Sequence, residues 1–311
     1  MKKSQDLFDA ISDSMSQLAK GETYECVCCD SADELPMPST DRLKDIVRLC
    51  REICFPGFFA AKPVHQSSLG FYQGVCIEQM AHKMRREVYA GLCLKHQKDK
   101  NFCPDNAKNQ ADAITADFVR WLPSLRQLLI GDVNAIFAGD PAAHDRAEVI
   151  LAYPAVRAIS GYRIAHKLFT LGVPLIPRVI TEIAHSETGI DINPQAQIGE
   201  RFAIDHGTGI VIGATCIIGN NVKIYQGVTL GALSHPDADK DAVRDTPRHP
   251  IIGNNVVIYA QATILGRIHI GDNAVIGGNV WLTNDIPDGA HVTQHNAQNS
   301  HAITTTNHTP Q

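Results

Sequence analysis

Residues 251–282 read IIGNNVVIYAQATILGRIHIGDNAVIGGNVWL, and this stretch decides the fold. An isoleucine or leucine returns at every sixth position, a period that fits neither an α-helix, with about 3.6 residues per turn, nor a strand, which alternates at every second residue. The same ladder occurs upstream, with a two-residue slip after Ile210. The ladder residues are Ile192, Ile198, Ile204, Ile210, Ile212, Ile218, Ile224, Leu230, Ile252, Ile258, Ile264, Ile270, Ile276 and Leu282.

Small or turn-forming residues flank the ladder. Asparagine or glycine often follows a ladder residue, and small or β-branched residues commonly stand two places before the next one, among them Ala196, Thr208, Val222, Val228 and Val256. Short strands of about four residues, joined by tight corners, would turn the chain once every three hexapeptides. This pattern is typical of the left-handed parallel β-helix, a known exception to right-handed crossovers.

The first half of the chain shows helical periodicity instead. We expect helices near 3–20, 43–54, 68–97, 109–121, 123–137, 146–153 and 154–171, separated by proline or glycine. The predicted fold class is α+β, an N-terminal α-helical domain followed by a left-handed parallel β-helix of hexapeptide repeats. The expected domains are an N-terminal helix and linker at 1–40, the helical domain at 41–187, the β-helix at 188–287 with an extruded loop at 231–251, and a tail at 288–311.

Composition excludes several classes of function. The chain has 311 residues and a net charge of −5, with dispersed basic residues, so nucleic-acid binding is disfavoured. The N-terminus lacks the apolar run of a signal peptide, and nowhere do about 18 uncharged apolar residues occur together. We therefore expect a cytoplasmic protein that does not bind a membrane.

The nine cysteines are concentrated in the first part of the chain. Without a secretory signal they indicate reduced thiols rather than a disulfide framework. Cys26, Cys28 and Cys29, with Cys50 and Cys54, could in principle hold a metal. Because no paired C-x-x-C knuckle is present, we expect ordinary thiols and no metal site.

The pair Asp205-His206 lies inside the ladder. A neutral imidazole on a rigid coil can take a proton near pH 7 when a carboxylate fixes its tautomer, so His206 is a candidate general base. Asp191, a little less than one coil earlier, could approach His206. A solvated Asp-His pair on the prism surface is the alternative that these residues alone leave open.

Longer motifs carry a family resemblance. The runs DINPQAQIGERFAIDHGTGIVIGATCIIGNNVKIYQGVTLGA and RHPIIGNNVVIYAQATILG, with the upstream GDPAA and YPAVRAISGYRIAH, resemble serine acetyltransferase. That family makes O-acetylserine for cysteine synthesis. The resemblance covers about residues 130–288, and the order of these elements distinguishes it from other hexapeptide acyltransferases.

The resemblance implies roles for single residues. His206 matches the catalytic base, and Asp191 matches the carboxylate that orients it. Asp140 and Asp205 match the carboxylates that hold the substrate ammonium, whereas Arg248 and His249 match the side that receives its carboxylate. Without the resemblance, Asp140 before Pro141 could be a helix N-cap, and Arg248 and His249 ordinary loop residues.

The same likeness implies a coenzyme and partners. The substrates would be L-serine and acetyl-CoA, with a main-chain amide at Gly231 or Ala232 stabilising the oxyanion and with Ala262, Gly277 and Gly278 beside the coenzyme. Family likeness implies a homotrimer or a dimer of trimers with an active site shared by two subunits. The chain ends in Pro310-Gln311 rather than the family's terminal isoleucine. A complex with O-acetylserine sulfhydrylase is therefore not expected.

Three other functions remain as alternatives. A prism can be a zinc carbonic anhydrase, but His206, His249 and His269 lack an H-x4-H ligand pair. An acyltransferase acting on an amino sugar, or on another hydroxy-amino acid such as homoserine, would keep the same ladder. A non-catalytic scaffold would keep it too, without needing the polar residues assigned above.

Overall fold

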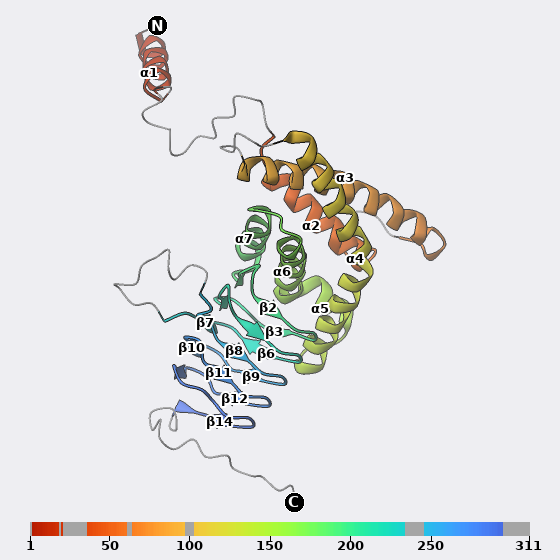
Figure 1. Ribbon diagram of the computed structural model, residues 1–311, viewed down its shortest axis with the longest axis vertical. Coiled ribbons are helices and arrows are strands. Elements are labelled where there is room, and N and C mark those ends of the chain that lie inside the picture. Colours follow the sequence, from red (N-terminus) through yellow and green to blue (C-terminus); the bar gives the residue numbers. More distant parts are fainter. Residues whose placement is uncertain are drawn as a thin grey trace, which may run out of the picture.

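The computed structural model describes residues 2–18, 20, 36–60, 64–96, 103–233 and 246–294. Helices occupy the first half of the chain and short parallel strands the second, as the change of period predicts (Figure 1). No helix among the described residues is both long and apolar enough to span a membrane. The helices are α1 Lys2–Leu18, α2 Thr40–Cys54, η2 Gln66–Ser68, α3 Leu69–Lys95, α4 Pro104–Gly139, α5 Arg146–Ala152, α6 Pro154–Thr170 and α7 Ile176–Thr188.

One expected helix boundary is wrong. We predicted a break at Pro123, between helices at 109–121 and 123–137, but α4 runs through it as a single helix. A proline inside a helix removes one hydrogen bond and costs about 3 kcal/mol. Phe118, Leu122, Leu125 and Leu129 are all nearly fully buried on either side of it. Packing of this continuous apolar stripe outweighs the local cost of the proline.

The second half of the chain winds into a triangular prism of three parallel sheets. Sheet A has the strand order β1-β4-β7-β10-β13, sheet B β11-β8-β5-β2, and sheet C β14-β12-β9-β6-β3. Each strand has two or three residues, shorter than the four expected. The strands are β1 Asp191–Ile192, β2 Gln197–Ile198, β3 Ala203–Asp205, β4 Val211–Ile212, β5 Ile217–Ile218, β6 Lys223–Tyr225, β7 Thr229–Gly231, β8 Ile251–Ile252, β9 Val257–Ile258, β10 Thr263–Leu265, β11 His269–Ile270, β12 Val275–Ile276, β13 Trp281–Leu282 and β14 His291–Val292.

The ladder forms the interior of this prism. Its side chains are buried along the whole stack, except that Ile198 is only partly covered. Ladder residues of successive coils are in register, as in the pairs Ile212 with Leu230 and Leu230 with Ile264. The prism runs past the expected end at residue 287, because β14 adds a strand to sheet C beside β12.

The slip in the ladder lies in the corner that contains His206. Ile192 pairs with Ile212 rather than Ile210, and Ile210 takes the inner place two residues before a ladder position. The carbonyl of Ile210 accepts the N–H of Asp191 at 2.9 Å, the ladder bond typical of that place. Thr208, which we expected there, is exposed. The two extra residues therefore bulge outward at this corner.

The motif YRIAH joins the helical domain to the first coil. Arg163 of α6 donates to the carboxylate of Asp132 in α4 at 2.6 and 2.8 Å and to the carbonyl of Gly199 at 2.8 Å. Asp132 also accepts the N–H of Phe202 at 3.0 Å. The side chains of Arg163 and Asp132 are 5% and 3% exposed. This buried pair fixes two helices on the start of the prism.

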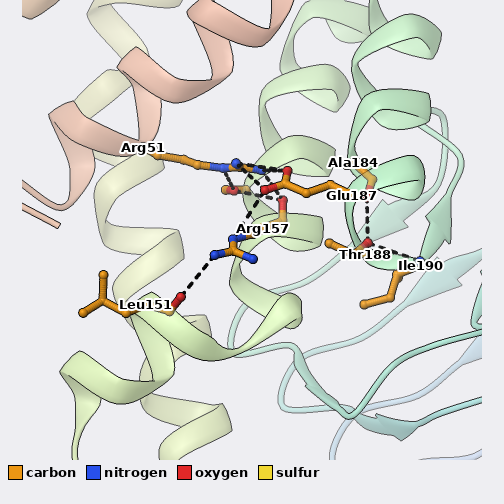
Figure 2. Close-up of polar contacts among 8 residues, drawn as sticks. Arg51, Leu151, Arg157, Ala184, Glu187, Thr188 and Ile190 are labelled. Carbon is orange, nitrogen blue, oxygen red and sulfur yellow. Dashed lines mark hydrogen bonds and ion pairs between the residues drawn. The ribbon is translucent and has the colours of Figure 1, made fainter. Parts of the chain in front are cut away.

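A second network of polar contacts connects α2 and α6 to α7 (Figure 2). Glu187 near the end of α7 is 3.2 Å from Arg51 of α2 and 3.4 Å from Arg157 of α6. The next residue, Thr188, accepts the N–H of Ile190 at 3.2 Å as the chain leaves the helix. These contacts set the direction in which α7 delivers the chain into β1.

Candidate active site

His206 lies at the corner of the prism between sheets C and A, here called corner CA. It follows β3 directly and has a left-handed backbone, with a φ of 56°. Gly207, next to it, also has a positive φ and packs so closely on Ile190 that a Cβ would overlap. The His206 side chain is 76% exposed, and its Nε2 is 3.9 Å from Asp205 Oδ1. The bulged corner thus presents the imidazole outward on a constrained backbone.

Asp205 has a partner that sequence reasoning missed. Its Oδ2 lies 2.9 Å from Nζ of Lys223, which follows one coil later on the same face of sheet C. Lys223 also donates to the carbonyl of Gly139 at 2.6 Å and lies over the ring of Tyr225. Burial pulls the pKa of Lys223 down, but hydrogen bonds to Tyr225 and Asp205 outweigh it, so the pKa is raised. The spacing of one coil was the signal that could have identified this pair.

Asp140 comes from the helical domain to the same corner. Its carboxylate accepts the hydroxyl of Tyr153 at 2.6 Å and the N–H of Ala142 at 2.8 Å. The Tyr153 hydrogen bond, followed by the Ala142 N–H, lowers the pKa of Asp140, and the charges of Lys223 and His206 act in the same direction. The same bond raises the pKa of Tyr153 to about 12. The carboxylate is therefore ionised, and it lies near enough to His206 and Lys223 for their charges to act on it.

The alternative role of Asp140 as a helix N-cap does not describe this site. Asp140 is the C-cap residue of α4, and Asp145 caps the start of α5 by accepting the N–H of Glu148. Tyr153, in the motif YPAV, lies between α5 and α6 and orients the Asp140 carboxylate. Corner CA therefore brings together Asp140, Tyr153, Asp205, His206 and Lys223 from both halves of the chain.

Asp191 opens β1, one coil from His206 in the stack, and pairs with Val211 across sheet A. Its Oδ1 lies 3.2 Å from Nη1 of Arg178 on α7. Within the part of the chain described, the Asp191 carboxylate makes no hydrogen bond or ion pair with His206. The expected orienting role of Asp191 thus stays a prediction, with Arg178 as the observed partner.

Arg248 and His249 lie at a different edge of the prism. They precede β8 of sheet B and pack against Thr215, in the turn between β4 and β5, so they belong to the corner between sheets A and B, here called corner AB. His249 is 8% exposed. Burial lowers its pKa, and the neighbouring charges of Arg248 and Arg267 lower it further. Within a single chain, the residues expected to bind the substrate carboxylate are therefore separated from corner CA by the width of sheet A.

The residues expected beside the coenzyme are in three different environments. Gly231 ends β7 and accepts the N–H of Gly266 at 3.1 Å, and Ala232 follows it, partly exposed. Ala262 is fully buried inside the prism, and its carbonyl accepts the N–H of Thr229. A Cβ at Gly277 or Gly278 would press on backbone carbonyls of neighbouring coils. Close coil stacking explains the small residues at these last two positions.

The metal alternatives concern residues in different places. Cys26, Cys28 and Cys29 lie outside the described residues, as does most of the loop expected at 231–251 and of the tail after 288. Within the described ranges, no three His, Cys, Asp or Glu side chains are grouped so that they could hold a metal ion. His206, His249 and His269 lie at corner CA, at corner AB and in β11, respectively. Within a single chain these three histidines therefore do not form a metal centre.

Comparisons with known proteins agree with this geometry. The family model described as bacterial transferase hexapeptide (six repeats) matches residues 249–284. The protein named "Serine acetyltransferase, plasmid" from Synechococcus elongatus is 42% identical over 262 residues, covering 83% of this chain and 82% of its own. A serine acetyltransferase of Staphylococcus xylosus is 46% identical over 156 residues, which cover 50% of this chain and 68% of that one.

Solved structures show the same fold. Entamoeba histolytica serine acetyltransferase 1, in complex with L-cysteine, superimposes with a TM-score of 0.70 at 34% identity, over 83% of this chain and 87% of that one. Neisseria gonorrhoeae serine acetyltransferase, in complex with serine, superimposes with a TM-score of 0.51 at 26% identity, over 80% and 94%. The fold class predicted from the ladder, helices followed by a left-handed parallel β-helix, is confirmed. With this likeness along most of its length, the chain belongs to the serine acetyltransferase family.

Proposed function

We propose that this chain transfers the acetyl group of acetyl-CoA to the hydroxyl of L-serine and releases O-acetylserine and CoA, the first step of cysteine biosynthesis. The observation that carries the proposal is corner CA, where His206 is exposed on a constrained backbone and faces carboxylates from both halves of the chain. An imidazole held in this way is suited to accept a proton from a hydroxyl group. Membership of the family supplies the reaction.

The chemical steps balance with one proton carrier. The imidazole of His206 takes the proton of the serine hydroxyl while that oxygen attacks the thioester carbonyl. The tetrahedral intermediate then collapses, the carbon–sulfur bond breaks, and the imidazolium returns its proton to the CoA sulfur. An amide N–H at Gly231 or Ala232 is the proposed donor to the oxyanion. Acetyl-CoA is a co-substrate here, and no step requires a metal.

The charges around His206 suit the ammonium end of serine. Asp140 and Asp205 are acceptors, and only Asp205 has a resident cation, Lys223, on one oxygen. Asp205 Oδ1 and the Asp140 carboxylate are therefore the proposed contacts of the substrate ammonium. Lys223 keeps the two carboxylates from repelling each other before the substrate arrives, since it lies close to both.

The carboxylate end of serine requires the other edge of the prism. Arg248 and His249 supply donors, but in one chain they lie at corner AB, away from His206. A zwitterion of the size of serine cannot span sheet A. We infer that the active site forms between two subunits, corner CA of one meeting corner AB of the next, in a homotrimer or a dimer of trimers. The groove between adjacent prisms, toward Gly277 and Gly278, is the proposed course of the coenzyme, whereas Ala262 is buried inside the prism and does not line it.

Asp191 is the proposed orienting carboxylate for His206, acting when the site is assembled around substrate. Catalytic hydrogen bonds are often long in unliganded structures and tighten when the substrate binds. A release of Asp191 from Arg178 would be part of that change. Cytoplasmic localisation remains a prediction from the sequence.

The proposal is tested by thiol release from acetyl-CoA with serine, homoserine or an amino sugar as acceptor. Serine should be the preferred acceptor, and His206→Ala should lower turnover by about 10² to 10⁴, the range for a lost general base. Circular dichroism should be unchanged, because the side chain is not packed inside its own chain. Release of CoA with only a non-serine acceptor would favour the alternative acyltransferase, and an unchanged rate in the variant would exclude His206 as the base.

A further inference from the structure

Thr215 makes four polar contacts with the segment that carries Arg248 and His249. Its hydroxyl oxygen accepts the N–H of Arg248 at 2.9 Å and the N–H of His249 at 3.1 Å. The same oxygen lies 2.8 Å from Nδ1 of His249, and the Thr215 N–H points at that nitrogen from 3.2 Å. Arg267 donates to the carbonyls of both Thr215 and His249, at 2.6 and 3.0 Å. The turn before β5 and the chain before β8 are thus fastened together.

The numbers of donors and lone pairs on Thr215 and His249 decide which of their atoms carries a hydrogen in these contacts. A threonine hydroxyl has one O–H and two lone pairs. Two backbone N–H groups occupy the lone pairs of Thr215, so its O–H must donate in the contact with His249 Nδ1. The backbone N–H of Thr215 is a second donor to the same nitrogen. Nδ1 therefore accepts, and the neutral ring carries its hydrogen on Nε2.

The ring has little freedom to adopt another arrangement. His249 packs over Gly213 at the end of β4, where any Cβ would overlap its Cδ2–Nε2 edge. A charged ring would place an N–H on Nδ1 against two donors, with Arg248 and Arg267 adding their charges. Neither a flipped nor a protonated imidazole fits this environment. The only hydrogen bond that the ring can still make to a ligand is one donated from Nε2.

We propose that Thr215 is a positioning residue for the substrate, because it holds His249 as a neutral group that can only donate a hydrogen bond from Nε2. This inference rests on the proposed function for the identity of the ligand, the carboxylate of serine. It gives the two edges of the site opposite polarity, acceptors at corner CA and donors at corner AB. His249 cannot act as a second general base, since its free nitrogen carries the hydrogen.

The first experiment measures the tautomer directly in the full-length protein. Histidine labelled with ¹⁵N is observed by magic-angle-spinning NMR on the sedimented enzyme at neutral pH, and the His249 signals are assigned by their loss in His249→Asn. We expect His249 in the neutral Nε2–H form in the absence of any substrate. A ring protonated on Nδ1 would overturn the proposal, whatever reaction the enzyme performs.

The second experiment separates positioning from folding. Thr215→Val should raise the KM for serine about tenfold, which corresponds to about 1.4 kcal/mol, within the range for one lost hydrogen bond. The KM for acetyl-CoA should change little and circular dichroism should show an intact fold, although the melting temperature falls because two backbone N–H groups lose their acceptor. Thr215→Ser, which retains the hydroxyl, should restore most of the serine KM. A fall in turnover with an unchanged serine KM would show that Thr215 does not act through substrate binding.

Two further variants guard against an indirect effect. Gly213→Ala displaces the His249 ring without touching Thr215, and it should reproduce the rise in serine KM. The double variant Thr215→Val, His249→Ala should resemble His249→Ala alone, because the two residues act as a unit. If the effects of the two substitutions on the serine KM add in the double variant, Thr215 acts only through the backbone of Arg248, and the inference is refuted. If no variant or wild-type protein acetylates serine while the tautomer is as expected, the proposed function fails and the geometry stands.

Discussion

Lys223 Nζ lies 2.9 Å from Asp205 Oδ2 and connects corner CA to the end of α4, where it binds the carbonyl of Gly139. The residue after Gly139 is Asp140, so one ammonium group lies between the two carboxylates proposed for the substrate. Its side chain is 17% exposed, which limits screening by water. The distance between the helical and prism halves of the site is therefore set by a lysine of the prism.

Lys223→Met should weaken both the junction and the substrate site. The variant leaves the Asp205 carboxylate and the Gly139 carbonyl without a donor, a loss of about 1.5 to 3 kcal/mol in the free energy of unfolding for hydrogen bonds to a charged group. The kcat/KM for serine should fall about tenfold or more as Asp140 and Asp205 move apart. Urea unfolding and steady-state kinetics measure these effects.

Lys223→Arg is the matched control for this change. Arginine keeps the charge and can reach both oxygens, so most of the stability should return, with a smaller loss of kcat/KM because the planar guanidinium fits a site built for a point charge less well. If methionine at position 223 leaves both quantities as in the wild-type protein, the bridge has no part in holding the site.

Asp191 and Arg178 give a test of the proposed orienting role. Asp191→Asn should lower turnover by about 10² or more, since the imidazolium formed in the reaction loses its supporting carboxylate. Arg178→Gln removes the observed partner of Asp191 and should leave turnover within a few-fold of the wild type. Kinetics at saturating serine separate the two. Equal losses in both variants would show that the Asp191–Arg178 ion pair is structural and that Asp191 does not orient His206.

The prism was predictable because its signal is local and repeated. Each coil shows the same period, so an error at one position, such as placing Thr208 rather than Ile210 inside, does not change the fold. The continuity of α4 through Pro123 was not predictable in that way. Propensity reports the local cost of the proline, whereas the burial that offsets it comes from helices far along the chain.

Among the site residues, too, those marked by a local sequence signal were predictable, and those that act across coils were not. His206 and Asp205 could be proposed because they are adjacent and lie beside the slip. Lys223 and Thr215 act across coils, through side-chain contacts that depend on the exact register and on the two extra residues at corner CA. The position of Arg248 and His249 at another corner follows from counting sheets, which requires knowing where the long insertion re-enters the prism.

His166 should make stability depend on pH. Burial lowers the pKa of His166 below the ordinary value of 6.5. Nδ1 lies 2.8 Å from the carbonyl of Pro194, and the ring stacks on Tyr162. The unfolded state binds a proton more readily than the folded state, so this contribution is fully present above the unfolded pKa and is lost as pH falls below it. The slope is at most about 1.4 kcal/mol per pH unit per group.

The melting temperature of the wild-type protein should therefore fall as the pH is lowered from about 7.5 to about 5.5. This window brackets the ordinary histidine pKa of about 6.5. His166→Gln removes the titrating group and should show a shallower fall, although its absolute stability is lower. His249 has a pKa shifted in the same direction, so part of the slope should persist. Parallel pH curves for wild type and variant would contradict the assignment.

Arg163→Met should be among the most destabilising single changes in the chain. It leaves Asp132 as a buried carboxylate without its cation, a loss of about 3 to 5 kcal/mol in the free energy of unfolding. Arg120→Met is the matched control, because it breaks an ion pair with Asp117 whose side chains are 74% and 54% exposed. That exposed pair should contribute less than about 1 kcal/mol. Urea unfolding compares the two variants, and equal losses would mean that the Arg163–Asp132 pair does not hold the helices on the prism.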